Sequence, residues 1–191
     1  MTEKDGKVKM IGIGYSGVDI VETAKLMGRI DADFYFLHTD DAVTTELEYE
    51  NVIRIGQKTT MGLDCGGDVE KGRLAVIENK AEIENIIKNS KRVILVTGLG
   101  GGTGSGGIVE LAKIAKKLNV LSMAIVTKPF GFEGKKRLEI ADKAIEQLQE
   151  LVDSLAVFDS DKILSSYDSV SVGAAFDILS ENLVDKMDSI L

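Results

Sequence analysis

The chain is poor in cysteine and proline. Its 191 residues include one cysteine, Cys65, and one proline. A single cysteine cannot form an internal disulfide, which excludes a disulfide-stapled domain and favours an intracellular, cytoplasmic location. Hydrophobic residues make up 44% of the chain and charged residues 28%. These values are typical of a globular domain and argue against wholesale disorder.

The chain also lacks an excess of basic residues and any long apolar run. It has 23 Lys and Arg against 31 Asp and Glu, a net charge of −8. This balance argues against nucleic acid or an anionic membrane as a partner. No stretch approaches the roughly 18 apolar residues of a membrane-spanning helix, and Met1–Lys9 has no signal-peptide pattern behind it. We therefore expect one cytoplasmic domain over residues 1–191.

Short apolar runs alternate with helical patterns along the chain. Expected strands cover residues 8–13, 34–37, 52–55, 93–96, 121–126 and 155–158. Expected helices cover residues 20–27, two short segments of 69–89 that break near Asn79, 108–118, 136–152 and 172–191. Strands that are nearly all apolar and alternate with helices predict an α/β fold: a three-layer, Rossmann-like, mostly parallel sheet covered on both faces.

Glycine is abundant, with 20 residues in three main clusters at 12–17, 62–67 and 98–107. Each cluster is short and lies beside an apolar run, which favours turns or close approach to a ligand over a flexible linker. The first cluster, residues 12–17, fits G-x-G-x-x-G, where amides at a helix start attract phosphate. Asp40, 23 residues after Gly17, is a candidate acceptor for a ribose hydroxyl. A tight structural turn is the alternative for this cluster.

The third cluster is more specific. Gly100–Gly106 reads G-G-G-T-G-S-G between an expected strand and an expected helix. Amides without side chains can surround a phosphate, and Thr103 and Ser105 add hydroxyl donors. No lysine follows, so the pattern is not the P-loop G-x-x-x-x-G-K-[ST]. A purely structural turn does not need six glycines in nine residues.

Three further loops add to this pattern. His38-Thr39-Asp40 is similar to N-T-D, Gly62–Gly67 is similar to G-L-G-A-G, and Pro129–Arg137 is similar to P-F-x-F-E-G-R-K-R. With the two glycine loops they stand in the order found in the tubulin/FtsZ family. The chain resembles the N-terminal GTP-binding domain of that family's FtsZ-like cell-division members over nearly its whole length.

The resemblance implies a site for GTP or GDP, with magnesium at the phosphates, and gives this chain no catalytic residue and no metal ligand. Glu133 and Arg137 would hold the ribose. Phe176 would stack on the base, while Ser160 and Ser180 stand where the family has longer polar base contacts. Asp19 can replace them, because a carboxylate accepts from both guanine N1–H and N2–H. The implied nucleotide-binding residues are Gly14, Tyr15, Ser16, Asp19, Asp40, Cys65, Gly66, Gly100, Gly101, Gly102, Thr103, Gly104, Ser105, Pro129, Glu133, Arg137, Ser160, Phe176 and Ser180.

Several residues depart from the family pattern or have simpler interpretations. Tyr15 adds bulk where the family has glycine. We interpret His38 as a hydrogen-bonded loop residue, and Cys65 as a replacement for a small loop residue. Phe176, Leu179, Leu183, Met187 and Ile190 recur at helical spacing and are expected to pack in the core.

The last residues of the sequence lead to expectations about activity and partners. Residues 172–191 resemble the family's inter-domain helix, and neither the following acidic loop nor a second domain is present in the sequence. Weak hydrolysis and no filaments of this chain alone are then expected. Expected partners are FtsZ-like filament subunits or a second copy of this chain. The chain would bind one end of such a filament and stop its growth there, and a second copy would be held by an exposed apolar stripe on this helix. Two other functions stay open: an NAD-type dinucleotide-binding domain, and a nucleotide-free interaction module.

Overall fold

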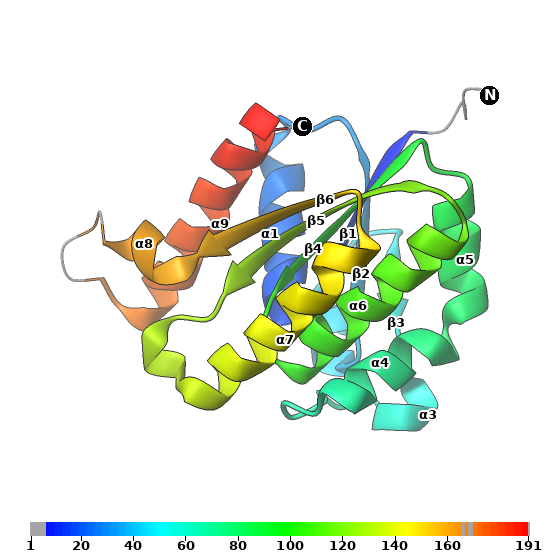
Figure 1. Ribbon diagram of the computed structural model, residues 1–191, viewed down its shortest axis with the longest axis horizontal. Coiled ribbons are helices and arrows are strands. Elements are labelled where there is room, and N and C mark those ends of the chain that lie inside the picture. Colours follow the sequence, from blue (N-terminus) through cyan, green and yellow to red (C-terminus); the bar gives the residue numbers. More distant parts are fainter. Residues whose placement is uncertain (1–6, 166, 168–169, 191) are drawn as a thin grey trace.

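A six-stranded parallel sheet forms the centre of the molecule (Figure 1). The computed structural model describes residues 7–165, 167 and 170–190; residues 1–6 and 191, at the two ends of the expected domain, lie outside this description. The sheet order is β3-β2-β1-β4-β5-β6, and every strand pairing is parallel. The strands are β1 Val8–Ile13, β2 Asp33–His38, β3 Val52–Arg54, β4 Arg92–Gly98, β5 Leu121–Lys128 and β6 Ser154–Asp159. The expected α/β fold is confirmed.

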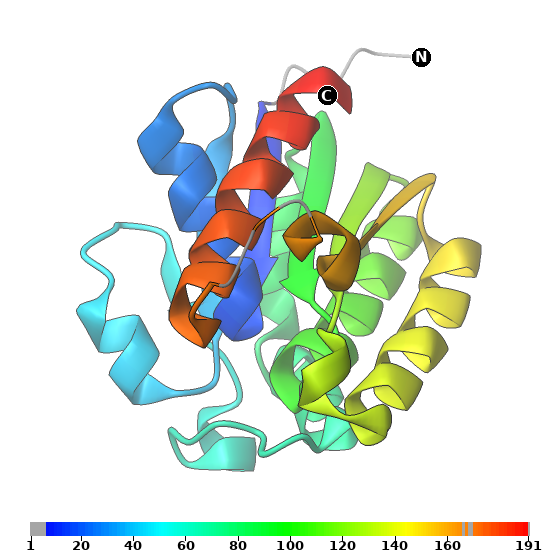
Figure 2. The ribbon, with the colours of Figure 1, turned by 90° about the vertical axis from the view of Figure 1, so that its left-hand side faces the viewer.

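Helices cover both faces of the sheet and complete three layers. One face is covered by α1 (Gly14–Met27) and α9 (Val172–Ile190), which lie side by side in front of the strands in Figure 2. The other face is covered by α4 (Val69–Glu78), α5 (Lys80–Lys88), α6 (Gly102–Lys117) and α7 (Lys135–Leu151). No helix of the described ranges is long and apolar enough to span a membrane.

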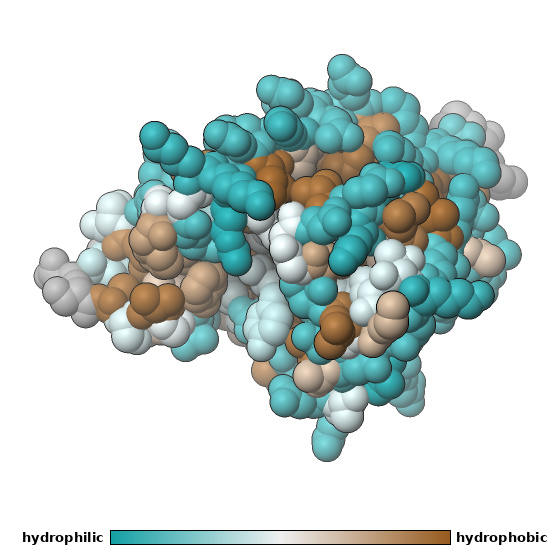
Figure 3. Space-filling model, turned by 90° about the horizontal axis from the view of Figure 1, so that it is seen from below, coloured by the Kyte–Doolittle hydropathy of each residue, from teal (hydrophilic) through white to brown (hydrophobic). Residues whose placement is uncertain are grey.

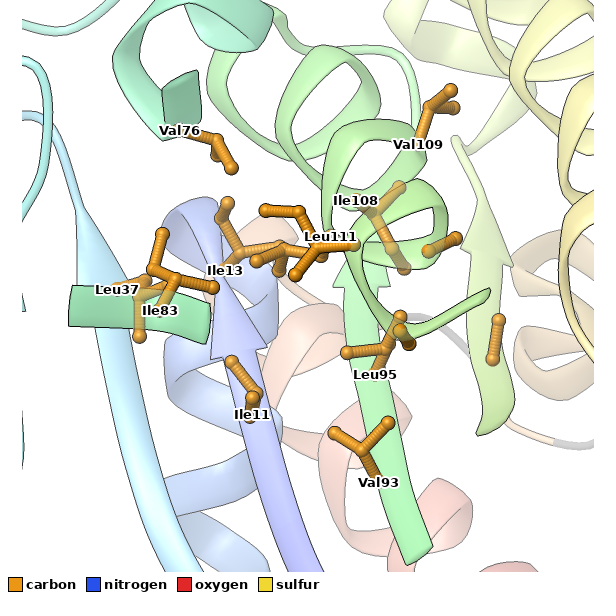
Figure 4. Packing of buried hydrophobic residues seen from close by; sticks show 14 of the residues in the cluster. Ile11, Ile13, Leu37, Val76, Ile83, Val93, Leu95, Ile108, Val109 and Leu111 are labelled. Carbon is orange, nitrogen blue, oxygen red and sulfur yellow. The ribbon is translucent and has the colours of Figure 1, made fainter. Parts of the chain in front are cut away.

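The strands divide their side chains between two hydrophobic cores, because successive residues of a strand point to opposite faces. In β1, Ile11 and Ile13 enter the core beneath α6, while Met10 enters the core beneath α1 and α9. Figure 4 shows Ile13 and Leu111 meeting between the sheet and α6. These paired cores hold the carboxyl ends of the strands, where the loops emerge, in fixed relative positions.

Four short elements were not expected from the sequence. They are α2 (Asp41–Glu46), α3 (Gln57–Thr60), the 3-10 helix η1 (Gly131–Glu133) and α8 (Ser160–Leu164). Each is too short to show a helical repeat of apolar residues. The two helices α2 and α8 begin at aspartate caps, Asp40 and Asp159, which accept backbone N–H groups. The expected break of residues 69–89 at Asn79 is confirmed.

Helix α9 packs its apolar side against the sheet face that it covers. Leu179, Leu183 and Met187 are buried, as expected, whereas Ile190 lies outside the described side chains. The expectation of an exposed apolar stripe is wrong for the described positions. Apart from Val172, the exposed non-glycine side chains described for residues 172–187 of α9 are charged: Asp177, Glu181, Asp185 and Lys186. The apolar stripe is already used by the core, so it is not available to hold a second copy.

Candidate functional site

A cavity of about 770 Å³ opens at the carboxyl ends of the strands. In the view from below (Figure 3), the surface is hollowed between the lobe that holds α8 with the start of α9 and the body of the molecule. Sixteen of the nineteen expected nucleotide-binding residues line this cavity, whereas Asp40, Cys65 and Ser105 do not. Segments far apart in sequence therefore meet at one site, at the sheet edge where open α/β sheets bind ligands.

Two helices begin at the cavity. Helix α1 starts at Gly14 and α6 starts at Gly102, and a Cβ placed on Gly14 would lie 2.9 Å from the Gly104 nitrogen. The free amides and the positive dipole end of each helix favour an anion such as phosphate. Gly101 lines the cavity at the N-cap of α6, and a Cβ placed on it would meet no protein atom within 4 Å. Gly101 thus presents bare backbone to a ligand.

Other glycines of the same cluster serve packing between helices. We expected a helix to start at Ile108, but α6 starts six residues earlier and includes Gly102 and Gly106. A Cβ on Gly106 would lie 1.9 Å from the Val69 carbonyl oxygen, and a Cβ on Gly72 would lie 2.1 Å from that of Gly102. The backbones of α4 and α6 touch, and this contact accounts for part of the glycine content that we had assigned to phosphate binding alone.

A buried polar network joins three loops behind the two helix starts. The Thr39 and Thr103 hydroxyls lie 3.0 Å apart, and the Cys65 thiol lies 3.9 Å from the Thr39 hydroxyl. Ser105 Oγ accepts the Gly100 N–H at 2.9 Å. Burial raises the pKa of the Cys65 thiol, which keeps it protonated and poorly nucleophilic. Cys65 and Ser105 thus hold the loops in place without lining the cavity.

Asp40 and His38 form a small hydrogen-bonded unit at the end of β2. The Asp40 carboxylate accepts the Ala42 N–H as the cap of α2, and the Asp40 N–H donates to His38 Nδ1; both distances are 2.9 Å. His38 is therefore hydrogen-bonded, as expected, but it is the last residue of strand β2 and not a loop residue. The Asp40 carboxylate is committed to its helix and does not line the cavity.

The His38 ring is buried beside an exposed tyrosine. His38 is 1% exposed, and its Nε2 has no hydrogen-bond partner within the described part of the chain. Tyr15 is 73% exposed and meets the His38 ring edge-on at 5.9 Å. Burial lowers the pKa of His38, against the opposing charges of Asp64 and Asp40. The imidazole is consequently neutral at pH 7. Its Nε2 is buried and makes no hydrogen bond within the described part of the chain.

One side of the cavity is built by η1 and the start of α7. Arg137 Nη1 lies 2.7 Å from Glu133 Oε2, and Glu133 Oε1 accepts the Phe130 N–H at 2.8 Å. The Glu133 carboxylate is therefore held from two directions, with Arg137 fixed beside it. On the same side of the cavity, Lys128 Nζ lies 2.6 Å from the Asp142 carboxylate.

The opposite side is built by α1, α8 and α9. Ser180 Oγ donates to Asp19 Oδ2 at 2.5 Å, and Ser160 Oγ donates to the Lys128 carbonyl. Phe176 meets the Phe130 ring edge-on at 5.2 Å. Burial raises the pKa of Asp19; the Ser180 hydrogen bond opposes this shift and the charge of Asp177 adds to it. The arrangement combines an aromatic face with a half-buried acceptor, a pairing suited to a heterocyclic base.

The cavity also contains residues that sequence reasoning did not assign to the site, among them Asp64, Lys136 and Asp177. Each lies next to an expected residue or within one of the loops compared with the family pattern, so its position in the sequence could have identified it. Asp64 Oδ1 lies 3.2 Å from Thr103 Oγ1 in the first turn of α6. No group of three or more acidic, histidine or cysteine side chains that could hold a metal ion occurs among the described residues.

Comparisons with known proteins agree with this geometry. The family described as "Tubulin/FtsZ family, GTPase domain" matches residues 7–168. The cell division protein FtsZ of Buchnera aphidicola subsp. Baizongia pistaciae is 40% identical over 157 residues, which cover 82% of this chain and 41% of that protein. FtsZ of Pseudomonas aeruginosa is 35% identical over 158 residues, or 83% and 40% of the two chains. The chain spans about two fifths of the length of these curated relatives.

Solved structures give the same result. An empty FtsZ dimer from M. jannaschii has a TM-score of 0.91 and 32% identity, covering 97% of this chain and 54% of that one. CetZ1 from Haloferax volcanii, solved as a GDP-bound monomer, has a TM-score of 0.84 and 27% identity over 94% of this chain and 58% of that one. By its sequence match and its three-layer fold, this chain belongs to the Tubulin/FtsZ family and contains that family's GTPase domain.

Proposed function

We propose that this chain binds a guanine nucleotide, GTP or GDP, in the cavity at the carboxyl edge of the sheet. The observation that carries the proposal is the meeting of two helix starts, at Gly14 and Gly102, at one end of a 770 Å³ cavity whose other walls hold Phe176 and Asp19. The helix starts suit phosphates, and the aromatic face with its half-buried acceptor suits a base. The volume is in the range of small-molecule sites.

The phosphates lie at the glycine loop in this proposal, and the ribose lies beside Glu133 and Arg137. Bare amides at Gly101 and the neighbouring glycines supply donors, and Thr103 lies beside them in the cavity lining. Glu133 is already positioned by the Phe130 amide and by Arg137, so it can accept ribose hydroxyls with little rearrangement. CetZ1 from Haloferax volcanii, a 27% identical neighbour, was solved bound to GDP, which supports the choice of a guanine nucleotide as the ligand.

Asp19 is the proposed source of base selection. Ser160 donates to a backbone carbonyl and Ser180 donates to Asp19, so neither hydroxyl proton is free for the base. The Asp19 carboxylate accepts hydrogen bonds, which suits the N1–H and N2–H donors of guanine and not the N1 acceptor of adenine. Guanine is therefore the proposed base.

Magnesium is the proposed metal. It binds through one or two protein oxygens together with phosphate oxygens, so a dedicated acidic cluster is not required. Asp64 and Thr103 are suitable residues, because their oxygens lie 3.2 Å apart at the first turn of α6. Bound there, the ion would supply charge neutralisation at the phosphates.

Weak hydrolysis, a cytoplasmic location and association with FtsZ-like subunits or a second copy are also proposals. For association we favour the surface that carries Tyr15, which lines the cavity, and the exposed Met61 and Leu63, which precede the lining residue Asp64 in the chain. The FtsZ of M. jannaschii, solved as a dimer, supports association within the family. Phosphate release measures hydrolysis, and light scattering with GTP and a full-length relative measures assembly.

Titration calorimetry with GDP, GTP, ATP and NAD tests the binding proposal. We expect GDP and GTP to bind more tightly than ATP, and NAD to bind weakly because the second glycine loop would be left unused. Preference for NAD would instead support a dinucleotide-binding domain. No binding of any of the four ligands would contradict the proposal and support a nucleotide-free interaction module.

A further inference from the structure

The carboxylate of Asp64 lies where the phosphates are proposed to bind. Its Oδ2 accepts the Gly66 N–H at 2.7 Å, and its Oδ1 lies 3.2 Å from the Thr103 hydroxyl. Both donors belong to the cavity lining, and Thr103 is the second residue of α6. An anionic side chain of the protein thus already engages two donors at the site proposed for an anionic ligand.

The cations of the cavity come from another segment. Lys128, Lys136 and Arg137 all belong to the stretch between the end of β5 and the start of α7. Lys128 is paired with Asp142, and Arg137 is paired with Glu133. Among the described lining residues, neither the 64–67 segment nor the glycine loop contributes a cation. The segment that carries Asp64 and the glycine loop at the start of α6 therefore supply no positive side chain of their own to offset the Asp64 carboxylate.

We propose that Asp64 makes binding of the nucleoside triphosphate depend on a divalent cation, and disfavours the triphosphate relative to the diphosphate when no cation is present. This inference rests on the proposed nucleotide site. Without the cation, the carboxylate repels the terminal phosphate and competes with it for the Gly66 amide. With Mg²⁺, an Asp64 oxygen and phosphate oxygens bind the same ion, so the carboxylate changes from an opposing charge to a ligand.

The size of the effect follows from Coulomb's law. Two like charges about 4 Å apart in a partly solvated site repel enough to change affinity by about tenfold or more. The diphosphate carries less charge and lacks the third phosphate group, which is the group proposed to lie near Asp64. We therefore expect a smaller effect on GDP than on GTP.

Titration calorimetry of the whole chain with GTP and GDP, in EDTA and in excess Mg²⁺, tests the inference. For the unmodified chain we expect Mg²⁺ to tighten GTP about tenfold and to tighten GDP less. Asp64→Asn should bind GTP in EDTA about tenfold more tightly than the unmodified chain, with little further gain from Mg²⁺. The asparagine oxygen can still accept the Gly66 N–H, which helps to preserve the loop.

Asp41→Asn is the matched control. Asp41 Oδ2 would lie 2.5 Å from a Cβ on Gly62, so Asp41 adjoins the same loop, but it does not line the cavity. Its bond from Gln57 can be made by an asparagine oxygen. We expect this variant to keep the full Mg²⁺ dependence, since it loses a nearby charge that does not face the ligand.

Three outcomes separate the two proposals. If GDP binds and GTP binds equally well in EDTA and in Mg²⁺, the inference about Asp64 is overturned while the nucleotide site stands. If Asp64→Asn keeps the Mg²⁺ dependence of the unmodified chain, or Asp41→Asn loses it equally, the assignment to Asp64 is overturned. If neither nucleotide binds in either buffer, the proposed function itself fails. The comparison within the unmodified chain does not require any variant to fold.

Discussion

Ser180 and Asp19 are joined by a hydrogen bond of 2.5 Å although they are 161 positions apart in the sequence. The bond links α9 to α1 at one wall of the cavity, and it uses only Oδ2 of the carboxylate. Burial raises the pKa of Asp19, and the Ser180 donor opposes that shift by stabilising the charged form. One carboxylate oxygen is thereby fixed, and Oδ1 can accept from a bound base.

Asp19→Ala should weaken GDP roughly tenfold to a hundredfold, because hydrogen bonds to a charged acceptor are lost. ADP should lose much less, because adenine has an acceptor at N1 and lacks the adjacent N1–H and N2–H donors of guanine. Calorimetry with both nucleotides measures the difference. Ser180→Ala is a milder change, because it keeps the Asp19 carboxylate but removes the hydrogen bond that positions it. Equal losses for GDP and ADP would show that phosphate and ribose contacts are the whole of recognition.

Gly101→Val should weaken nucleotide binding roughly tenfold to a hundredfold while the fold survives. A Cβ at Gly101 meets no protein atom within 4 Å, so the new side chain enters the space proposed for phosphate. Gly102 is a poorer position for this test, since its Cβ would lie 2.7 Å from the Asp68 carbonyl oxygen. Unchanged affinity in a variant with an unchanged melting temperature would contradict the assignment of this loop.

Gly106→Ala should lower the free energy of unfolding by about 3 kcal/mol, because added volume in a closely packed contact forces backbone shifts. The new methyl group would lie 1.9 Å from the Val69 carbonyl oxygen. Urea denaturation measures the change, with Gly101→Ala as the control at an open position of the same cluster. A Gly106→Ala protein of ordinary stability would mean that α4 and α6 do not approach so closely.

Stability should fall as the pH drops below about 6.5, in part because of His38. Burial lowers the pKa of this histidine in the folded chain, so below pH 6.5 the unfolded chain binds a proton that the folded chain does not. Between pH 7.5 and 5.5 the unmodified chain should lose up to about 1.4 kcal/mol more than His38→Asn. Urea denaturation at the two pH values measures this difference. A loss of equal size in both proteins would show that His38 is not the titrating group.

Much of the fold was predictable because its signals are local. Nearly continuous apolar runs such as Val93–Val96 mark buried parallel strands, and their alternation with helical patterns predicts the layers. The short helices α2 and α8 escaped prediction because an aspartate cap and one turn carry no periodic signal. The start of α6 was misjudged because glycine disfavours helix in isolation, whereas here contact with α4 selects it.

The sequence by itself determined the parallel α/β architecture and the order of the glycine loops, because each depends on residue type and spacing within a short segment, and its resemblance to the tubulin/FtsZ family supplied the candidate nucleotide-binding residues. Only the tertiary structure decided which of those residues face the cavity. It assigned Asp40 to a helix cap, paired the Ser105 hydroxyl with the Gly100 N–H away from the cavity lining, and brought Asp64 to Thr103. These outcomes depend on contacts between distant segments, and such contacts form only once two cores have fixed the strands and helices in space.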